Sequence, residues 1–257
     1  MSTPPIRIEQ LTMAYGDRVI QRDINVDINQ GDIFIIMGGS GCGKSTLLKH
    51  LIGLNTPAKG RILYDGEDYF SASEERKQIT RKRWGILFQS GGLFSAMTLA
   101  ENIALPLSQY TDLSASAIAD LVHYKLSLVG LGGFEEYYPA EISGGMQKRA
   151  GLARAMALDP DILFFDEPSA GLDPISARRL DELILELRDT LGCTVVIVTH
   201  ELASIFAIGN NSVFLDAETR TMIAQGNPRE LRDHSPNDTV RLFLHRGEDT
   251  TPTGEIA

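Results

Sequence analysis

Apolar residues along this chain occur in short continuous runs separated by longer segments with helical spacing. Residues 33–37 and 162–165 are uninterrupted apolar runs, and residues 194–199 form a third run rich in β-branched side chains. Runs of this length are typical of fully buried strands. Between the last two runs, apolar residues recur every three or four positions, at Leu180, Leu183, Ile184, Leu187 and Leu191. This alternation predicts an α/β fold with a buried sheet.

Further strands and helices are expected in the rest of the chain. Residues 24–28 alternate between apolar and polar, which indicates a half-buried strand. Further strands are expected at residues 6–15, 60–66, 84–88, 212–216 and 221–225. Helices are expected at residues 47–52, 74–83, 114–129, 144–158, 174–191, 228–233 and 238–246, with a further helix that begins after Thr98 and ends at Pro106.

The chain between Gln89 and Leu158 shows no strand pattern, so we interpret this stretch as a helical insertion. We therefore expect residues 1–88 and 159–235 to form one α/β core, and residues 89–158 to form an inserted helical subdomain. Residues 236–257 would be a C-terminal helix and tail, and residues 247–257 are expected to be disordered.

Composition narrows the class of protein. The 257 residues suit one large domain or two joined lobes, and the net charge of −10 argues against a general nucleic-acid binder. Cys42 and Cys193 give no disulfide framework, and reduced thiols in the cytosol are expected. No apolar run of about 18 residues occurs, and the first residues lack signal-peptide character, so we expect no membrane span and no secretion.

A glycine-rich stretch between the first buried strand and a helix fits the pattern G-x-x-x-x-G-K-[ST]. Its residues are Gly38, Gly39, Ser40, Gly41, Cys42, Gly43, Lys44, Ser45 and Thr46. Glycines allow successive backbone N–H groups to point at one anion, and the helix adds its positive end. Lys44 would then contact the β- and γ-phosphates and the Ser45 hydroxyl would bind Mg²⁺. The alternative is an ordinary glycine turn.

Polar residues follow three of the expected strands at the edge where phosphate would lie. Gln89 follows one strand, Asp166 and Glu167 end another, and His200 follows a third. Asp166 would bind Mg²⁺ and Glu167 would orient and deprotonate the attacking water. Gln89 would help hold Mg²⁺ or its water, and His200 would contact the γ-phosphate. The alternatives are surface acids and a structural histidine.

Two further features favour nucleotide binding. Ser143, Gly144 and Gly145 open a helix whose bare backbone amides offer a second anion site. One chain would thus have two phosphate-binding sites, the glycine-rich loop and this helix N-terminus. This indicates that two copies of the chain share nucleotides between them. Tyr15 stands beside a glycine near the loop, where its ring could stack on a base or simply pack in the core. The basic residues of 76–83 are interpreted as a solvated surface, with a docking face as the alternative.

These motifs, in this order, resemble the ATP-binding subunits of ABC transporters, and the match covers nearly the whole chain. Residues 169–173 resemble the loop that follows the catalytic acid, and Tyr15 takes the place of the adenine-stacking aromatic. The resemblance implies a P-loop NTPase (RecA-like) core with an N-terminal antiparallel β subdomain and an inserted α-helical subdomain. It also implies Mg²⁺-dependent ATP hydrolysis by Glu167, His200 and Lys44. Two copies would enclose ATP between Lys44 of one and Ser143 of the other.

Residues 89–94 and 101–107, together with Met146, resemble the ATPases that work with MCE-domain proteins in Mla-type phospholipid transport. This likeness implies an integral membrane permease docked near Leu93, Phe94 and Met97, an MCE-domain protein, and a small STAS-domain subunit. It places the chain at the cytoplasmic face of the inner membrane, as a peripheral subunit energising phospholipid transport between the inner and outer membranes.

Two alternatives remain. An importer subunit for a small solute, such as an amino acid, would share every catalytic motif. A non-transport ABC ATPase of DNA repair or translation usually carries two ATPase units, coiled-coil insertions or basic arms, and the sequence shows none of these.

Overall fold

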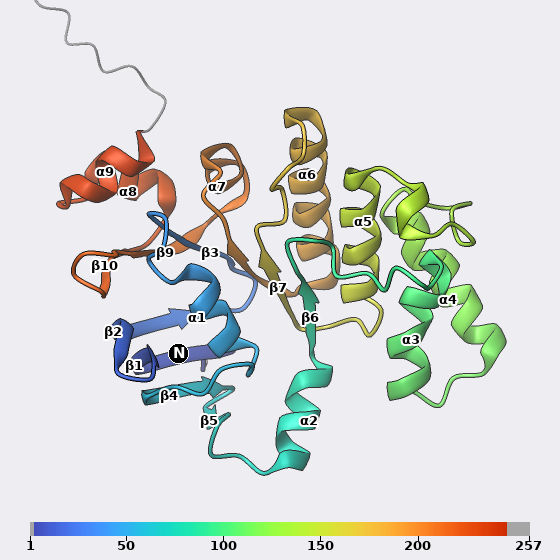
Figure 1. The fold of residues 1–257 in the computed structure, drawn as a ribbon, viewed down its shortest axis with the longest axis horizontal. Helices are drawn as coiled ribbons and strands as arrows, with labels where there is room; N and C mark the ends of the chain where they lie inside the picture. The colour runs from blue at the N-terminus through green and yellow to red at the C-terminus, as the bar shows by residue number, and fades with distance from the viewer. Residues whose placement is uncertain (1–2, 246–257) are drawn as a thin grey trace, which may run out of the picture.

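A computed structural model describes residues 3–245 and contains two β-sheets with helices packed around them (Figure 1). The larger sheet has six strands in the order β10-β9-β3-β8-β7-β6. The five strands from β9 to β6 pair in parallel, and β10 pairs antiparallel with β9 at the edge. The strands are β3 (Ile33–Gly38), β6 (Trp84–Leu87), β7 (Ile162–Asp166), β8 (Thr194–Val198), β9 (Asn211–Leu215) and β10 (Met222–Gln225).

The smaller sheet is antiparallel and has the order β2-β1-β4-β5. Its strands are β1 (Ile6–Tyr15), β2 (Arg18–Ile28), β4 (Lys59–Tyr64) and β5 (Glu67–Asp68). The expected strand at residues 24–28 therefore begins six residues earlier. Irregular register between β1 and β2 breaks the alternation of its first half, so that pattern alone does not reveal it.

The helices connect these strands. They are α1 (Lys44–Leu51), α2 (Glu74–Lys82), α3 (Leu99–Tyr110), α4 (Ala115–Leu128), α5 (Gly144–Ala155), α6 (Pro174–Leu191), α7 (Leu202–Ile208), α8 (Pro228–His234) and α9 (Asp238–Leu244). The short β5 and α7 were not expected from the sequence. The interval from α3 to α5 is helical, as predicted, and includes a 3-10 turn at Pro139–Glu141.

The central strands are buried on both faces, which explains their continuous apolar runs. In β3, Ile33, Ile35 and Met37 belong to one core, and Phe34 and Ile36 belong to the other. The first core lies under α3 to α7 and α9, and the second lies beneath α1 and the antiparallel sheet. Figure 1 shows these layers on opposite sides of the central sheet.

The expectation that Pro106 ends its helix is wrong. Helix α3 continues through Pro106 to Tyr110. Proline removes one backbone hydrogen bond, but packing can compensate for this loss. Leu99, Ile103 and Leu107 are all buried in the larger core along the same face of α3. Burial of this apolar face stabilises the helix on both sides of the proline.

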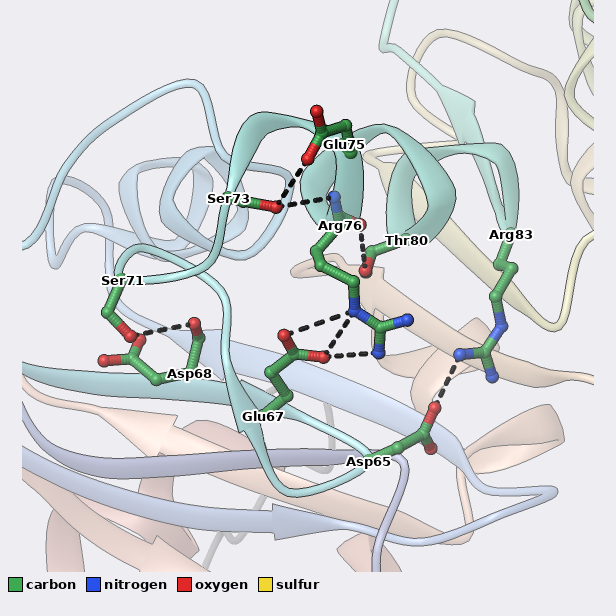
Figure 2. A network of polar contacts seen from close by, with 9 residues as sticks. All are labelled: Asp65, Glu67, Asp68, Ser71, Ser73, Glu75, Arg76, Thr80 and Arg83. Carbon is green, nitrogen blue, oxygen red and sulfur yellow. Dashed lines mark hydrogen bonds and ion pairs between the residues drawn. The ribbon is translucent and has the colours of Figure 1, made fainter.

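Charged residues fasten α2 to the antiparallel sheet. Figure 2 shows Arg76 bound to Glu67 of β5 and Arg83 bound to Asp65 in the turn before it. Arg83 also pairs with Asp161, just ahead of β7, and so joins the two sheets. Much of the basic stretch therefore pairs with local acids, whereas Arg81 and Lys82 also line a surface groove.

Within residues 3–245, no helix combines the length and apolar character needed to cross a membrane. The predicted helix at residues 238–246 is α9, which buries Val240 and Leu244 in the larger core. The expected disordered tail lies outside the described residues.

Candidate functional site

The loop between β3 and α1 has a backbone that only glycine fits at two of its positions. Gly38 has φ 146°, and a Cβ there would lie 2.2 Å from the carbonyl oxygen of Leu215. Gly43 has φ 100°, and its Cβ would meet the Ile20 side chain at 2.7 Å. Both positions therefore exclude a side chain on steric and conformational grounds.

Two interactions fix this loop from the protein side. The Lys44 ammonium donates to the carbonyl oxygens of Gly38 and Gly39, at 3.0 Å each. Buried Gln21 of β2 donates to the carbonyl oxygens of Cys42 and Asp216, at 2.7 Å each. Gln21 thereby ties the loop to the end of β9. Cys42 is itself buried, and this burial raises the pKa of its thiol.

A cavity of about 540 Å³ opens in front of this loop. It collects residues from distant parts of the chain: Ile20, Gly38, Gly39, Ser40, Gly41, Gly43, Lys44, Ser45, Thr46, Gln89, Glu167, His200 and Phe243. The loop therefore shares one cavity with residues that follow β6, β7 and β8. Its position at the carboxyl ends of parallel strands is where α/β sheets bind ligands.

Ser45 and Asp166 meet at the side of this cavity. The Ser45 hydroxyl donates to Asp166 Oδ1 at 3.0 Å, which places two oxygen ligands side by side. Mg²⁺ prefers oxygen ligands and usually takes only one or two protein carboxylates beside phosphate oxygens. The pair therefore fits a magnesium ion carried by a bound phosphate chain.

Glu167 stands in a strained backbone conformation at the end of β7. Its φ is 49°, a region that costs energy for residues other than glycine and is often found at functional sites. Glu167 Oε1 lies 2.8 Å from His200 Nδ1. Glu167 Oε2 is buried and has no hydrogen-bond partner among the described residues. One carboxylate oxygen thus lies against His200, and the other is left without a partner among the described residues.

Lys148 of α5 joins two of these segments from below and was not foreseen from the sequence. Its ammonium is buried and donates to the backbone carbonyls of Gln89 and, at 3.4 Å, Glu167. Burial lowers the pKa of Lys148, while the charges of Glu167 and Asp166 oppose this effect. Lys148 therefore connects α5 to the backbone that carries Gln89 and Glu167.

We expect Lys148→Met to lower kcat for ATP hydrolysis by about tenfold to a hundredfold, since hydrogen bonds to a charged group contribute about 1.5–3 kcal/mol. The substrate KM should change much less, because Lys148 supports the backbone and does not line the cavity. Steady-state kinetics of the full chain would measure both constants. Lys49→Met, which alters an exposed lysine on α1, should leave both unchanged. An equal loss in the two variants would contradict a positioning role.

Ser143, Gly144 and Gly145, the expected second anion site, do not lie at the glycine loop of the same chain. Ser143 caps α5 by accepting from the Met146 N–H at 3.3 Å, and Gly144 begins that helix. Ser143 and Gly145 line a separate cavity of 250 Å³ together with Leu172 and Ser176. Tyr15 likewise stands apart, 53% exposed at the end of β1, where its hydroxyl accepts from Asn55.

Phe243 was missed because nothing in its local sequence points to the phosphate loop. It lies on α9, about 200 residues from Lys44, yet lines the same cavity. Its ring packs edge-on against Phe214 of β9, with centroids 5.1 Å apart. Helix α9 therefore supplies an apolar wall to this cavity.

We expect Phe243→Ala to raise the KM for ATP about fivefold with little change in kcat. Full burial of such a side chain contributes about 1.5–3 kcal/mol, and a partial contact with nucleotide about 1 kcal/mol. The adjacent Leu242 is 74% exposed, so Leu242→Ala is the matched control. A KM that moves equally in both variants, or in neither, would exclude a nucleotide contact by Phe243.

Comparison with known proteins agrees with this geometry. A protein-family model described as ABC transporter matches residues 21–170. The probable ribonucleotide transport ATP-binding protein mkl of Mycobacterium leprae is 42% identical over 97% of this chain and 71% of its own length. The intermembrane phospholipid transport system ATP-binding protein MlaF of Haemophilus influenzae is 41% identical over 96% of this chain and 92% of its own length.

Solved structures of ABC ATPases also resemble this chain. A dimeric ATP-binding cassette in a post-hydrolysis state with ADP and phosphate superposes with a TM-score of 0.77 at 27% identity, covering 86% of this chain and 98% of that one. The cbiO1 protein of Clostridium perfringens, part of an ABC transporter complex, gives 0.80 at 27% identity, covering 91% and 97%. These matches show that this chain belongs to the ABC transporter family as an ATP-binding and ATP-hydrolysing subunit.

Proposed function

We propose that two copies of this chain hydrolyse Mg²⁺-ATP at shared sites and thereby drive phospholipid transport between the inner and outer membranes. The proposal of a shared site rests on one observation: the two sets of residues expected to bind the nucleotide lie in separate cavities of one chain. Lys44 and Glu167 line one cavity, while Ser143 and Gly145 line another. A two-fold dimer would bring Ser143 of one copy opposite Lys44 of the other. The dimeric cassette with ADP and phosphate supports this arrangement.

The chemical step follows from the residues of the nucleotide cavity. The backbone amides of Gly41 and Gly43, with Lys44, would bind the phosphate chain, and Tyr15 would stack on the adenine. Glu167 would accept a proton from the attacking water through Oε2, and His200 would hold Oε1 and contact the γ-phosphate. Ser45, Asp166 and Gln89 would hold Mg²⁺, which neutralises charge that develops on the phosphate oxygens.

A surface groove of about 610 Å³ offers a place for the membrane partner. Its lining includes the apolar residues Ile86, Phe88 and Leu105 and the cationic residues Arg81, Lys82 and Arg154. Phe94 also lines the groove and is 51% exposed, with Arg154 over its ring at 5.9 Å. Of the three residues proposed to contact the permease, Phe94 therefore has the most accessible position, whereas Leu93 packs partly into the core.

The identity of the cargo and of the remaining partners rests on the relatives. MlaF is named for intermembrane phospholipid transport, and mkl for ribonucleotide transport. We favour phospholipid because residues 89–94, residues 101–107 and Met146 resemble the MCE-associated ATPases. On this proposal the chain works with a permease, an MCE-domain protein and a small STAS-domain subunit at the cytoplasmic face of the inner membrane.

Affinity purification from native membranes in mild detergent, followed by mass spectrometry of proteins and lipids, tests this proposal. We expect a permease, an MCE-domain protein and phospholipid to co-purify with the tagged chain. Phe94→Asp should release the permease, while Tyr137→Asp, at an exposed aromatic outside the groove, should retain it. A different permease with a soluble solute-binding protein would overturn the phospholipid assignment and leave the ATPase intact.

A further inference from the structure

A third cavity, of about 590 Å³, lies between α6 and α7. Figure 1 shows these two helices side by side on the face of the central sheet opposite α1. The cavity is lined by the turn after Glu167, by α6, and by the chain that follows His200. It shares no lining residue with the nucleotide cavity or with the groove proposed for the permease.

Three buried polar side chains line this cavity, namely Ser169, Asp181 and Ser204. Asp181 of α6 is 6% exposed and accepts a hydrogen bond from Ser204 of α7 at 2.8 Å through Oδ2. Ser169 is 5% exposed, and its hydroxyl has no partner in the described part of the chain. Buried polar groups are normally satisfied, so the Ser169 hydroxyl indicates a missing polar ligand.

The charge and shape of the lining define the chemistry of that ligand. Asp181, Glu182 and Glu201 contribute carboxylates, whereas Arg178 is the cation, and it pairs with Glu182 at 3.0 Å. The remaining walls are largely apolar and include Leu172, Leu185 and Ile208. A cationic group beside Asp181 with an apolar body against these walls would complement both features.

The cavity is lined by residues that follow both Glu167 and His200 closely in the sequence. Ser169 follows Glu167 by two residues on the same turn. Glu201 Oε1 lies 3.7 Å from His200 Nε2, so a cation bound to this carboxylate would lie close to His200. Occupancy would also fix the spacing of α6 and α7, the helices that follow Glu167 and His200.

We propose that this cavity is a regulatory site for a protonated primary amine with a compact apolar body, whose ammonium binds Asp181 and Ser169 and whose occupancy slows ATP hydrolysis. The site requires only the ATPase and is independent of the cargo proposed above.

The pH dependence of binding follows from the surroundings of Asp181. Burial raises the pKa of Asp181 to about 6, with Glu182 adding to this effect and the Ser204 hydrogen bond opposing it. Arg178 and Glu201 are the other charged groups of the lining. A primary amine stays protonated throughout this range, whereas Asp181 ionises as the pH rises through its pKa. Binding should therefore be tighter at pH 7.5 than at pH 5.

The test is a titration of the full chain with 4-phenylbutylamine, 4-phenylbutanol and 4-phenylbutyrate, which share one apolar body and differ in charge. Methyl NMR of Leu172, Leu185 and Ile208 would report binding. We expect saturable shifts with the amine, at least tenfold weaker binding of the alcohol, and none of the carboxylate. At saturating amine, kcat should fall at least threefold without a matching rise in the KM for ATP.

Asp181→Asn should weaken amine binding at least tenfold and abolish its effect on kcat. Glu186→Gln removes the same charge from an exposed position of α6 and should bind the amine normally. Equal affinity for the amine and the alcohol on the unmodified chain would overturn the proposal without any variant. Binding that leaves kcat unchanged would overturn its regulatory part.

Discussion

The Glu167→Gln subunit is expected to bind ATP with near wild-type affinity and to hydrolyse it at least ~100-fold more slowly, within the range for loss of a general base. Glutamine keeps the shape of the side chain and can still contact His200, but it cannot accept the proton of the attacking water. The strained backbone at Glu167 and its unpartnered Oε2 favour this role over a structural one. Nucleotide titration and phosphate release on the same preparation would separate binding from turnover.

The same variant should accumulate as an ATP-bound dimer, because hydrolysis is the step that reopens a shared site. Size-exclusion chromatography with ATP and Mg²⁺ would detect this species, and Glu186→Gln should remain as in the unmodified chain. Ordinary steady-state turnover by Glu167→Gln would remove Glu167 from the role of base. Slow turnover without a stable dimer would instead count against hydrolysis as the opening step.

The sequence predicted the site best where chemistry depends on strand ends. Asp166, Glu167, Gln89 and His200 each follow an apolar run, and parallel strands bring such positions to one edge. The glycine pattern likewise carries its own geometry, since Gly38 and Gly43 occupy conformations that other residues avoid. The structure places all of these residues around one cavity or directly beneath it.

Residues that contact the site from distant parts of the sequence could not be recognised from their neighbouring residues. Gln21 reaches the loop from the antiparallel sheet, and Phe243 reaches the cavity from the C-terminal helix. Lys148 looked like one polar residue in an ordinary helix, although its ammonium supports the Gln89 and Glu167 backbones. These contacts arise only from tertiary packing, so neither periodicity nor motif spacing could predict them.

Local rules also failed where packing overrides them. Pro106 was expected to end a helix, but the buried face of α3 continues through it. Helix α7 is only seven residues long and follows directly after His200, so its periodicity was too short to detect. That short helix forms one wall of the cavity with Asp181, which explains why the proposed regulatory site became visible only in the structure.

Lys44→Ala is expected to weaken ATP binding about tenfold to a hundredfold. A charge-assisted hydrogen bond of this kind contributes about 1.5–3 kcal/mol, and each 1.4 kcal/mol is about tenfold in affinity. In the structure the Lys44 ammonium is bound to the Gly38 and Gly39 carbonyls, directly on the loop, and it pairs with no carboxylate of residues 3–245. Phosphate oxygens would therefore find a cation already placed at the loop.

Isothermal titration with ATP in the presence of Mg²⁺ would measure this loss, and Lys49→Ala, an exposed lysine on the same helix, is the matched control. Thermal unfolding without nucleotide should be similar for the two variants, because the bonds removed with Lys44 lie at the surface of an open cavity. Together with Glu167→Gln, the pair separates two functions of one cavity, since one variant should lose binding and the other turnover. Unchanged ATP affinity in Lys44→Ala would mean that the glycine loop does not carry the triphosphate, and the cavity beside it would lose its assignment as the nucleotide site.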